Sequence, residues 1–366
     1  MQWTRHHLDL IAEDAATTAP LILGSPPQIL PDLDLWDMWP VQEEDGSASV
    51  HLGRELWMGL SAPATGHPEE RHDLARIRLL AKGEDGWTDL GNVFADGASL
   101  GSREWSGSAV RRSDGTISVF YTAAGRRSEA RPTFVQRVVE SRSKLPQEPG
   151  AHHEEIVRSD GRTYLVADDL EGGPGRIRAF RDPAWFRDPA DGREYLLIAA
   201  SVAWRDRHMG AVALAGAGPG GWSLGTPLLT ADGINREIER PHVVVHESSY
   251  YLFFCTQRHS FEPLGSAPTG LYGFVAPRLT GPYEPLNGSG LVIGNPSAQP
   301  DQAYAWMVLT DLRVVSFVNY RTTDADAELT RSHFGGTIAP FLRLTLNGTV
   351  SKLSASVDAA RCSPGR

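Results

Sequence analysis

Short runs of β-branched and aromatic residues recur along this sequence, separated by clusters of Gly, Pro, Asp and Ser. The runs lie at residues 55–60, 75–80, 116–122, 163–166, 194–199, 250–255, 271–276 and 314–320. Several of them follow a polar turn, as in SDGTISVFY at residues 113–121. Because helical periodicity is scarce by comparison, this pattern predicts an all-β fold of the sandwich, barrel or propeller type.

The 366 residues are compatible with two ordinary domains or with one large β domain. We favour a single domain, because no Pro- and Ser-rich linker divides the sequence. We expect residues 1–30 to form an N-terminal wrapping segment, residues 31–353 to form the domain itself, and residues 354–366 to form a C-terminal tail.

Composition argues against several classes of function. The net charge of −10 disfavours a nucleic-acid partner, because a phosphate backbone requires a basic face. Two cysteines, Cys255 and Cys362, cannot build a disulfide framework or a Cys-based zinc site, and the histidines lack the spacing of a helical zinc site, so we expect no metal. We also expect no membrane association, since long apolar runs are absent, and a location in the cytoplasm or outside the cell without a recognisable signal peptide.

The first candidate for chemistry is Asp37, which lies in the motif WDMWP between Trp36 and Trp39. An aspartate in a loop is commonly a turn or cap residue. However, an indole can stack on the apolar face of a sugar, and a neighbouring carboxylate can attack the anomeric carbon. The flanking tryptophans therefore favour a carbohydrate site.

Two further motifs place an indole or a guanidinium beside a candidate side chain. EWSGSA contains Trp105 and Ser106, although a buried Trp at the start of a strand would give the same pattern. FRDP contains Arg181 and Asp182, where the proline keeps Asp182 extended and the arginine could bind both a carboxylate and sugar hydroxyls. A second FRDP contains Asp188, which we interpret as a turn residue because it leads directly into the next predicted strand.

The fourth motif, REIERPH, contains Glu237 and Glu239, which an extended strand would point to the same side. Alternating charge on a surface strand is the other interpretation. Together with Asp37 and Asp182, these residues suggest a retaining glycosidase, which needs a nucleophilic carboxylate and an acid/base roughly 5 to 5.5 Å apart. A third carboxylate would stabilise the positive charge of the transition state.

The motifs WDMWP, EWSGSA, FRDP and EIERP, in this order, resemble glycoside hydrolase family 68, which comprises bacterial levansucrases, inulosucrases and β-fructofuranosidases. LYGF at residues 271–274, SFV at 316–318 and FGGTIAP at 334–340 are also similar to the family. The resemblance extends from about Trp3 to about Leu353.

This resemblance implies a five-bladed β-propeller with a funnel-shaped central pocket. It also implies a double displacement on sucrose through a fructosyl-enzyme, without a cofactor. By motif position Asp37 corresponds to the nucleophile, Asp182 to the transition-state stabiliser and Glu239 to the general acid/base. The expected partners are sucrose and the sugars that accept its fructosyl group.

Other motif positions correspond to substrate contacts. The family lines its fructosyl subsite at the positions of Trp36, Trp105, Ser106 and Arg181, and the positions of Glu237 and Arg240 fall beside the acid/base and the glucosyl subsite. Gln257 occupies a position near the acceptor side, where polymer-forming relatives generally have histidine or arginine. A shift of one residue would bring Arg258 there instead. This departure and the short chain favour hydrolysis and short fructooligosaccharides over long levan.

Three alternatives stay open from the sequence. The first is a polymer-forming levansucrase. The second is another propeller glycosidase, such as an inverting arabinan-cleaving enzyme, which would hold a water between its acid and its base. The third is a catalytically silent propeller that keeps the tryptophans for sugar binding.

Overall fold

The computed structural model describes residues 1–24, 26–144, 151–167, 177–204, 209–231, 233–322 and 328–354. Within these ranges the chain is almost entirely β, with one short α-helix, α1 (Arg5–Leu8), and two 3-10 helices, η1 (Pro68–Asp73) and η2 (Arg258–Ser260). The predicted all-β class is confirmed. None of the described helices has the length and apolar character needed to cross a membrane.

The largest sheet has nine strands in the order β5-β4-β3-β1-β6-β7-β8-β9, with β2 paired to β3. Its strands are β1 (Leu33–Gln42), β2 (Val50–His51), β3 (Arg54–Pro63), β4 (Arg76–Gly83), β5 (Gly86–Asn92), β6 (Arg103–Arg111), β7 (Ile117–Ala124), β8 (Gln136–Ser143) and β9 (His152–Val157). Strands β1 and β6 are parallel and pair only at Val41 with Ala109 and at Gln42 with Val110. The sheet therefore consists of two antiparallel halves joined by a short parallel seam.

Three five-stranded antiparallel sheets follow along the chain. The second sheet contains β10 (Phe180–Arg187), β11 (Glu194–Ser201), β12 (Gly210–Gly218), β13 (Gly221–Leu224) and β14 (Leu229–Thr230). The third contains β15 (Glu239–His246), β16 (Ser249–Thr256), β17 (Gly270–Ala276), β18 (Glu284–Pro285) and β19 (Leu291–Gly294). The fourth contains β20 (Ala303–Val308), β21 (Arg313–Tyr320), β22 (Phe334–Ile338), β23 (Leu342–Asn347) and β24 (Val350–Ser354).

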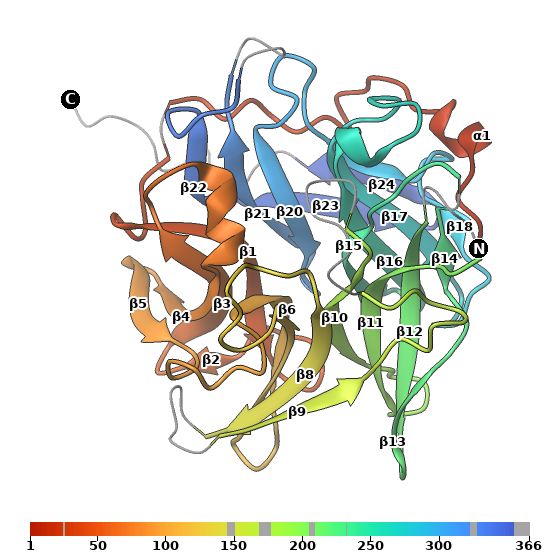
Figure 1. Ribbon diagram of the computed structural model, residues 1–366. Helices are drawn as coiled ribbons and strands as arrows, with labels where there is room; N and C mark the ends of the chain where they lie inside the picture. The colour runs from red at the N-terminus through yellow and green to blue at the C-terminus, as the bar shows by residue number, and fades with distance from the viewer. Residues whose placement is uncertain are drawn as a thin grey trace.

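Five strands form the inner part of the molecule: β1, β6, β10, β15 and β20. Figure 1 shows them near the middle, whereas β5, β9, β13 and β18 lie toward the outside. Each inner strand contacts the next in this order, and β20 contacts β1, so the inner strands form a closed ring. Side chains from different sheets can therefore meet at the middle of the molecule.

Each inner strand is interrupted by a bulge in its pairing with the next strand of its sheet. The irregularities lie at Trp36/Trp39, Trp105/Gly107, Arg181/Ala184, Glu239/His242 and Tyr304/Met307. Four residues within them have left-handed backbone, namely Asp37 (φ 49°), Asp182 (φ 58°), Arg240 (φ 51°) and Ala305 (φ 56°). A bulge re-aims the side chains of a strand, and bulges are frequent next to active sites.

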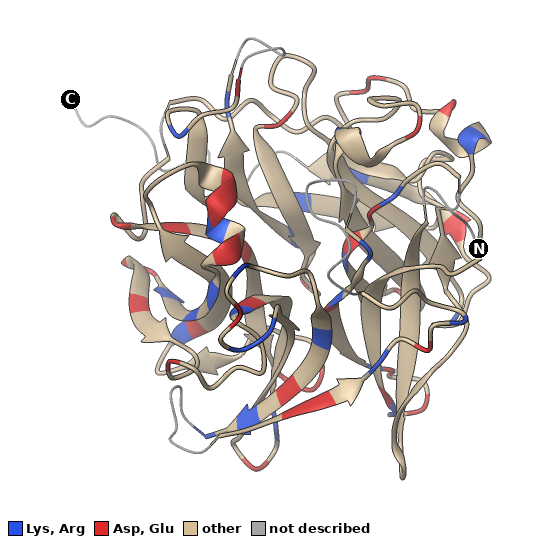
Figure 2. Ribbon diagram, viewed as in Figure 1, with Lys and Arg blue, Asp and Glu red and all other residues tan. Residues whose placement is uncertain are grey.

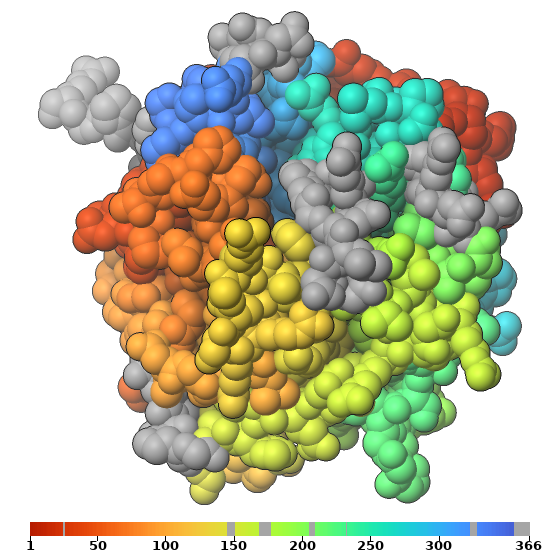
Figure 3. Space-filling model, viewed as in Figure 1, coloured from red at the N-terminus to blue at the C-terminus, as the bar shows by residue number. Residues whose placement is uncertain are grey.

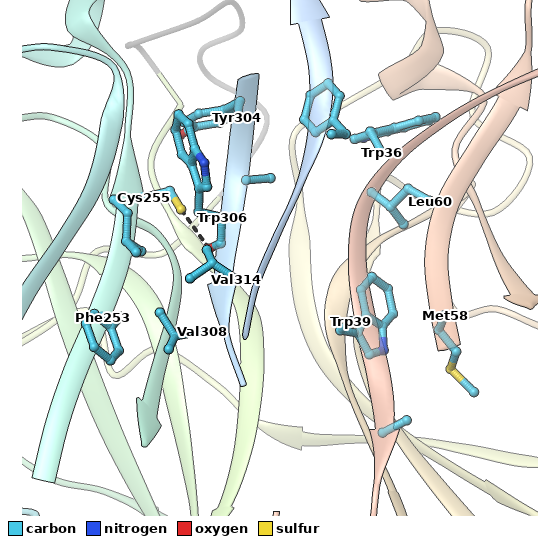
Figure 4. Close-up of a cluster of buried hydrophobic side chains, with 14 of the residues drawn as sticks. Trp36, Trp39, Met58, Leu60, Phe253, Cys255, Tyr304, Trp306, Val308 and Val314 are labelled. Carbon is cyan, nitrogen blue, oxygen red and sulfur yellow. Dashed lines mark hydrogen bonds between the residues drawn. The ribbon is translucent and has the colours of Figure 1, made fainter. Parts of the chain in front are cut away.

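The core between the first and last sheets is rich in tryptophan. Figure 4 shows Trp36 and Trp39 from β1 with Leu60 from β3 on one side, and Trp306 and Val308 from β20 on the other. All five side chains are buried. Burial of a large apolar side chain stabilises the fold by about 1.5–3 kcal/mol, so this layer holds the first sheet against the last.

The N-terminal residues are attached to the second and third sheets. The amino group of Met1 donates a hydrogen bond to the Leu228 carbonyl oxygen, 3.0 Å away, next to β14. Trp3 is buried, its indole N–H donates to the Ser289 carbonyl oxygen at 3.0 Å, and its ring packs edge-on against Phe254 and Phe261. Trp3 therefore belongs to the hydrophobic core.

One predicted strand is wrong, the run at 163–166. In the structure Tyr164 makes only an isolated bridge with Val202. The carboxylate of Asp160 accepts hydrogen bonds from the backbone N–H groups of Arg162, Thr163 and Tyr164, which uses donors that a strand ladder would need. The other predicted runs overlap strands β3, β4, β7, β11, β16, β17 and β21. Residues 355–366, which are most of the predicted tail and include Cys362, lie outside the described residues.

Acidic and basic residues are interspersed along the described chain (Figure 2). Arg78 pairs with Asp89 on the neighbouring strand (2.5 Å between nitrogen and oxygen), and Arg112, just after β6, pairs with Glu194 on β11 of the next sheet (2.6 Å). Part of the acidic and basic side chains is thus neutralised locally in ion pairs.

Candidate active site

Asp37 lies in the bulge of β1 and is oriented by a residue of β6. The Ser106 hydroxyl donates a hydrogen bond to Oδ2 of Asp37. Ser106 itself occupies the bulge of β6, where the next residue is Gly107. A Cβ at Gly107 would come within 1.9 Å of the Phe120 carbonyl oxygen, so only glycine fits there. The EWSGSA motif therefore serves to bring its serine to the carboxylate.

Asp182 is buried in the bulge of β10. Its Oδ2 accepts a hydrogen bond from the backbone N–H of Arg240 (3.1 Å), and its own N–H donates to the Thr122 hydroxyl (2.9 Å). Burial raises the pKa of Asp182 to about 7, with the charges of Glu239 and Asp37 adding to the effect and that of Arg181 opposing it. The three carboxylates therefore act on one another electrostatically.

Glu239 is held at both of its carboxylate oxygens. Arg181 Nη2 donates to Oε1 of Glu239 at 2.9 Å, and the Tyr304 hydroxyl donates to Oε2. The same Arg181 nitrogen contacts Oε1 of Glu237 at 3.2 Å, so both glutamates face one guanidinium, as expected for residues i and i+2 of an extended chain. The Glu239 side chain is 22% exposed, against 7% for Glu237, so the carboxyl group of Glu239 is the more accessible of the two.

Arg181 is the cationic centre of the cluster. Its burial opposes the charged form, but the carboxylates of Glu237, Glu239 and Asp182 outweigh this and raise its pKa further. Its Nη1 is buried and has no hydrogen-bond partner among the described residues. Because buried donors are almost always paired, this nitrogen is available for an oxygen of a ligand or a water.

The two candidate tryptophans pack against η1. The Trp105 indole N–H donates to the His72 carbonyl oxygen at 2.9 Å, and the His72 ring meets the Trp36 ring edge-on. Arg71 lies over Trp36, with its Cζ 5.4 Å from the ring centroid. The Nε1 of Trp36 is buried without a partner in the described part of the chain, so it is a second unpaired donor besides Arg181 Nη1.

The segment η1 is tied to the last sheet as well. The Tyr320 hydroxyl at the end of β21 donates to Oε1 of Glu69 at 2.6 Å, and Glu69 also accepts from Arg71 Nη1 at 3.1 Å. In Figure 3 the orange segment that contains η1 lies beside the blue segments of the last sheet. The contacts around Trp36 thus join segments that are far apart in the sequence, η1 and the end of β21.

Arg240 directs two donors toward backbone. Its Nη1 donates to the Ala305 carbonyl oxygen and its Nη2 to the Met38 carbonyl oxygen, both at 2.7 Å. These carbonyls belong to β20 and β1. The sequence placed Arg240 beside the glucosyl subsite, whereas in the structure these two nitrogens bind protein oxygens.

Gln257 and Arg258 directly follow β16, the strand that pairs with the strand of Glu239. Cys255 is the cross-strand partner of Glu239, and Gln257 lies two residues beyond it at the start of η2. Arg258 is engaged with Asp301, through Nη2 at 3.0 Å and Nε at 3.2 Å. Of these two predicted acceptor-side residues, Arg258 is thus the one already held by a carboxylate.

The turn interpretation of Asp188 is confirmed. It follows β10 in a tight turn, where its Oδ1 accepts from the Ala190 N–H (2.9 Å) and from the Tyr250 hydroxyl (2.5 Å). Asp188 and Asp182 lie at opposite ends of the strand. The second FRDP motif thus stabilises a hairpin and the contact with β16.

Sequence reasoning missed Tyr304. This residue lies in the run AYAWMV, whose apolar side chains are typical of a buried strand. Nothing local distinguishes its hydroxyl, because its partner Glu239 is distant in sequence and in another sheet. Among the described residues, no group of three or more His, Cys, Asp or Glu side chains could hold a metal ion.

The arrangement combines four carboxylates, those of Asp37, Asp182, Glu237 and Glu239, with one buried guanidinium and an unpaired indole N–H. Such a site stabilises positive charge that develops on a polar, hydroxyl-rich ligand, since fixed carboxylates need no reorganisation during a reaction. In chemical terms, a carboxyl group such as that of Glu239 can exchange a proton, and a carboxylate such as that of Asp37 can act as a nucleophile or as a fixed charge.

Comparison with known proteins gives matches along nearly the entire chain. A sequence profile of the family described as Levansucrase/Invertase matches residues 1–219 and 204–358. The levansucrase of Zymomonas mobilis subsp. mobilis is 32% identical over 381 residues, which cover 94% of this chain and 88% of that protein. Levansucrase LscA of Pseudomonas savastanoi pv. glycinea is 31% identical over 405 residues, covering 97% and 94%. Among solved structures, the inulosucrase from Halalkalicoccus jeotgali bound to kestose has a TM-score of 0.89 and 36% identity, with 98% of this chain and 96% of that chain covered.

Proposed function

Because the chain belongs to the Levansucrase/Invertase family, glycoside hydrolase family 68, and is a glycoside hydrolase or fructosyltransferase, we propose that it cleaves sucrose by a retaining mechanism. The fructosyl group passes through a covalent intermediate on Asp37 to water or to a sugar acceptor. The observation that carries this proposal is that Asp37, Asp182 and Glu239 lie at the bulges of three different inner strands.

We assign the five-bladed propeller to the sheets as follows. The two halves of the nine-stranded sheet would be two blades, and the three five-stranded sheets would be the others. The closed ring of inner strands supports this assignment, because propeller blades begin with the strand nearest the axis. The central pocket would be a funnel along that axis.

The same assignment gives one domain with two flanking segments. Residues 1–30 would wrap around the domain of residues 31–353, and residues 354–366 would form the tail. The contacts of Met1 and Trp3 with the second and third sheets support the wrapping. So does the hydrogen bond from the Leu353 N–H to the Ala16 carbonyl oxygen at 2.8 Å.

In the first step of the proposed mechanism, a carboxylate oxygen of Asp37 attacks the anomeric carbon of the fructosyl residue. The bond from that carbon to the bridging oxygen breaks, and Glu239 donates a proton to this oxygen as glucose leaves. In the second step Glu239 takes a proton from water or from an acceptor hydroxyl, whose oxygen displaces Asp37. Asp182 stabilises the positive charge that develops on the sugar in both steps.

Free donors support the assignment of the fructosyl subsite. Trp36 Nε1 and Arg181 Nη1 are buried and unpartnered among the described residues, and sugar hydroxyls are suitable acceptors. Trp105 and Ser106 complete this subsite next to Asp37. Glu237 would lie toward the leaving glucosyl unit, beside the acid/base.

We further propose that water competes well as an acceptor, so that hydrolysis and short fructooligosaccharides prevail over long levan. Gln257 follows the cross-strand partner of Glu239 and carries a neutral amide. An imidazole or guanidinium at this place would bind an incoming sugar hydroxyl more strongly.

The first experiment incubates the purified protein with sucrose and follows glucose, fructose and oligosaccharides over time. Equal release of glucose and fructose indicates hydrolysis, and an excess of glucose indicates transfer. Absence of turnover would contradict the proposal in favour of a sugar-binding propeller, and an inverted anomeric configuration of the first product would contradict the retaining mechanism.

The second experiment traps the intermediate. Rapid denaturation of Glu239→Gln during reaction with an activated fructoside should leave a hexosyl adduct on the peptide that contains Asp37, detected by mass spectrometry. The variant Asp188→Asn in the same background is the matched control and should give the same adduct. A hexosyl group on any residue other than Asp37 would overturn the assignment of the nucleophile.

A further inference from the structure

We propose that Arg240 is a positioning residue, and not a sugar ligand, which together with His242 clamps the bulge beside Glu239 to three other inner strands. The inference rests on the proposed function, because it concerns how the site of sucrose cleavage is held. Its basis is the set of hydrogen bonds that converge on this one residue.

The guanidinium of Arg240 joins two strands across the middle of the molecule. Nη1 donates to the Ala305 carbonyl oxygen on β20 and Nη2 to the Met38 carbonyl oxygen on β1, both at 2.7 Å. Only 7% of Arg240 is exposed. Both terminal nitrogens thus bind protein oxygens, and the burial of the side chain limits the access of a sugar hydroxyl to its other N–H groups.

The backbone of Arg240 makes two more connections. Its N–H donates to Oδ2 of Asp182 on β10 at 3.1 Å. Its carbonyl oxygen lies 2.9 Å from Nδ1 of His242, whose Nε2 lies 2.9 Å from the backbone nitrogen of Val308 on β20. Arg240 therefore links β15 to β1, β10 and β20.

The tautomer of His242 follows from these contacts. A backbone N–H can only donate, so Nε2 must accept from Val308, and the ring proton must lie on Nδ1 and point to the Arg240 carbonyl oxygen. Burial lowers the pKa of His242 to about 4, in agreement with a neutral ring. The imidazole is thus a fixed bridge between two backbones.

The clamp acts on residues adjacent to the proposed reacting groups. Met38 follows Asp37, Ala305 follows Tyr304, and Arg240 follows Glu239. Asp37, Arg240 and Ala305 all have left-handed backbone, which is unfavourable for a residue other than glycine. Such strain persists only where surrounding contacts stabilise it, and the hydrogen bonds of Arg240 supply these contacts at all three bulges.

The two roles predict different kinetics. A lost sugar ligand weakens the binding of sucrose, whereas a lost clamp leaves binding intact and misplaces the nucleophile and the acid/base, so that kcat falls. A misplacement of about 1 Å can cost about a hundredfold in rate.

The test uses Arg240→Asn, which tolerates left-handed backbone but lacks the guanidinium, and Arg240→Lys, which keeps the charge with one donor centre. We expect kcat for sucrose to fall on the order of a hundredfold in the Asn variant and less in the Lys variant. The Kd of sucrose, measured by calorimetry in a Glu239→Gln background, should change by less than about threefold in both, which is under about 0.7 kcal/mol. Near-UV circular dichroism checks the fold.

A tenfold weaker Kd with an unchanged kcat would overturn the clamp and make Arg240 a sugar ligand. His242→Gln offers an amide oxygen to the Val308 N–H but has no donor at the position of Nδ1, which binds the Arg240 carbonyl oxygen. This variant therefore tests the clamp even if the Arg240 variants do not fold. Its kcat should fall with an unchanged KM, and wild-type kcat would contradict the proposal. If the wild type itself fails to cleave sucrose, the proposed function is wrong. If the wild type is active and the variants are unaffected, the proposed function stands and the clamp is wrong.

Discussion

The hydroxyl of Tyr304 donates a hydrogen bond to Oε2 of Glu239, although the two residues are 65 positions apart and lie in different sheets. Arg181 binds the other oxygen of the same carboxylate at 2.9 Å. Glu239 is therefore fixed from two sides by two neighbouring strands, β10 and β20. This arrangement suits a group that must give and regain a proton at one position.

Removing the tyrosine hydroxyl tests this relationship. Tyr304→Phe should lower kcat about ten- to a hundredfold, because a hydrogen bond to a charged group contributes about 1.5–3 kcal/mol. Initial rates of glucose release measure the effect. Tyr250→Phe, which removes the hydroxyl that binds Asp188 far along β10, is the control and should keep its activity. A Tyr304→Phe enzyme with wild-type rate would show that Arg181 alone orients Glu239.

The three carboxylates should each be indispensable. Asp37→Asn, Asp182→Asn and Glu239→Gln are expected to reduce kcat/KM by at least about 10² to 10⁴, since each supplies a different part of one mechanism. Thermal unfolding should show that the variants are folded. Near-native turnover by any of the three would contradict its assigned role.

Asp188 provides the matched comparison for Asp182, because both stand in an Arg-Asp-Pro sequence. Asp188→Asn should cost about 1 kcal/mol of stability through weaker bonds to Tyr250 and Ala190. Its rate of sucrose cleavage should stay unchanged. A folded but inactive Asp188 variant would assign the role of transition-state stabiliser to Asp188 in place of Asp182.

The raised pKa of Asp182 predicts how stability depends on pH. Burial raises this pKa from 3.8 to about 7 in the folded protein. Between these values the folded state keeps a proton that the unfolded state releases, so the contribution of Asp182 to stability is present below about pH 4 and is lost as the pH rises to about 7. Asp182→Asn has no such dependence. The Tm of the variant minus the Tm of the wild type should therefore increase between about pH 4 and about pH 7. The increase corresponds to roughly 1–4 kcal/mol in the free energy of unfolding, and the difference should be constant above about pH 7. A Tm difference that is independent of pH would refute the raised pKa.

The acceptor preference can be changed at Gln257. Gln257→His and Gln257→Arg should raise the ratio of glucose to free fructose, and lengthen the products, without a large change in sucrose consumption. A difference of about 1.4 kcal/mol between sugar and water as acceptor changes this ratio tenfold. Product analysis by chromatography measures it. Arg258→Ala is the control, because Arg258 is already bound to Asp301. If only Arg258→Ala changes the products, Arg258 is the acceptor-side residue.

Local sequence was enough to predict the β class and seven of the strands, β3, β4, β7, β11, β16, β17 and β21. Runs such as 250–255 and 314–320 lie within β16 and β21, because alternation and turn residues act over a few positions. The run at 163–166 is the exception. There the Asp160 carboxylate captures the backbone N–H groups, so local side-chain chemistry outweighs the tendency to form a strand.

The sequence by itself determined which residues could do the chemistry, since Asp37, Asp182 and Glu239 stand out beside indoles and guanidinium groups within short motifs. Only the tertiary structure decided what holds them. Arg240 reaches the Met38 carbonyl oxygen across 202 positions, and Tyr304 reaches Glu239 from another sheet. These contacts exist because bulges at matching places of the five inner strands turn side chains toward a common centre. No short window of sequence contains that geometry, because it depends on how separate sheets close around one another.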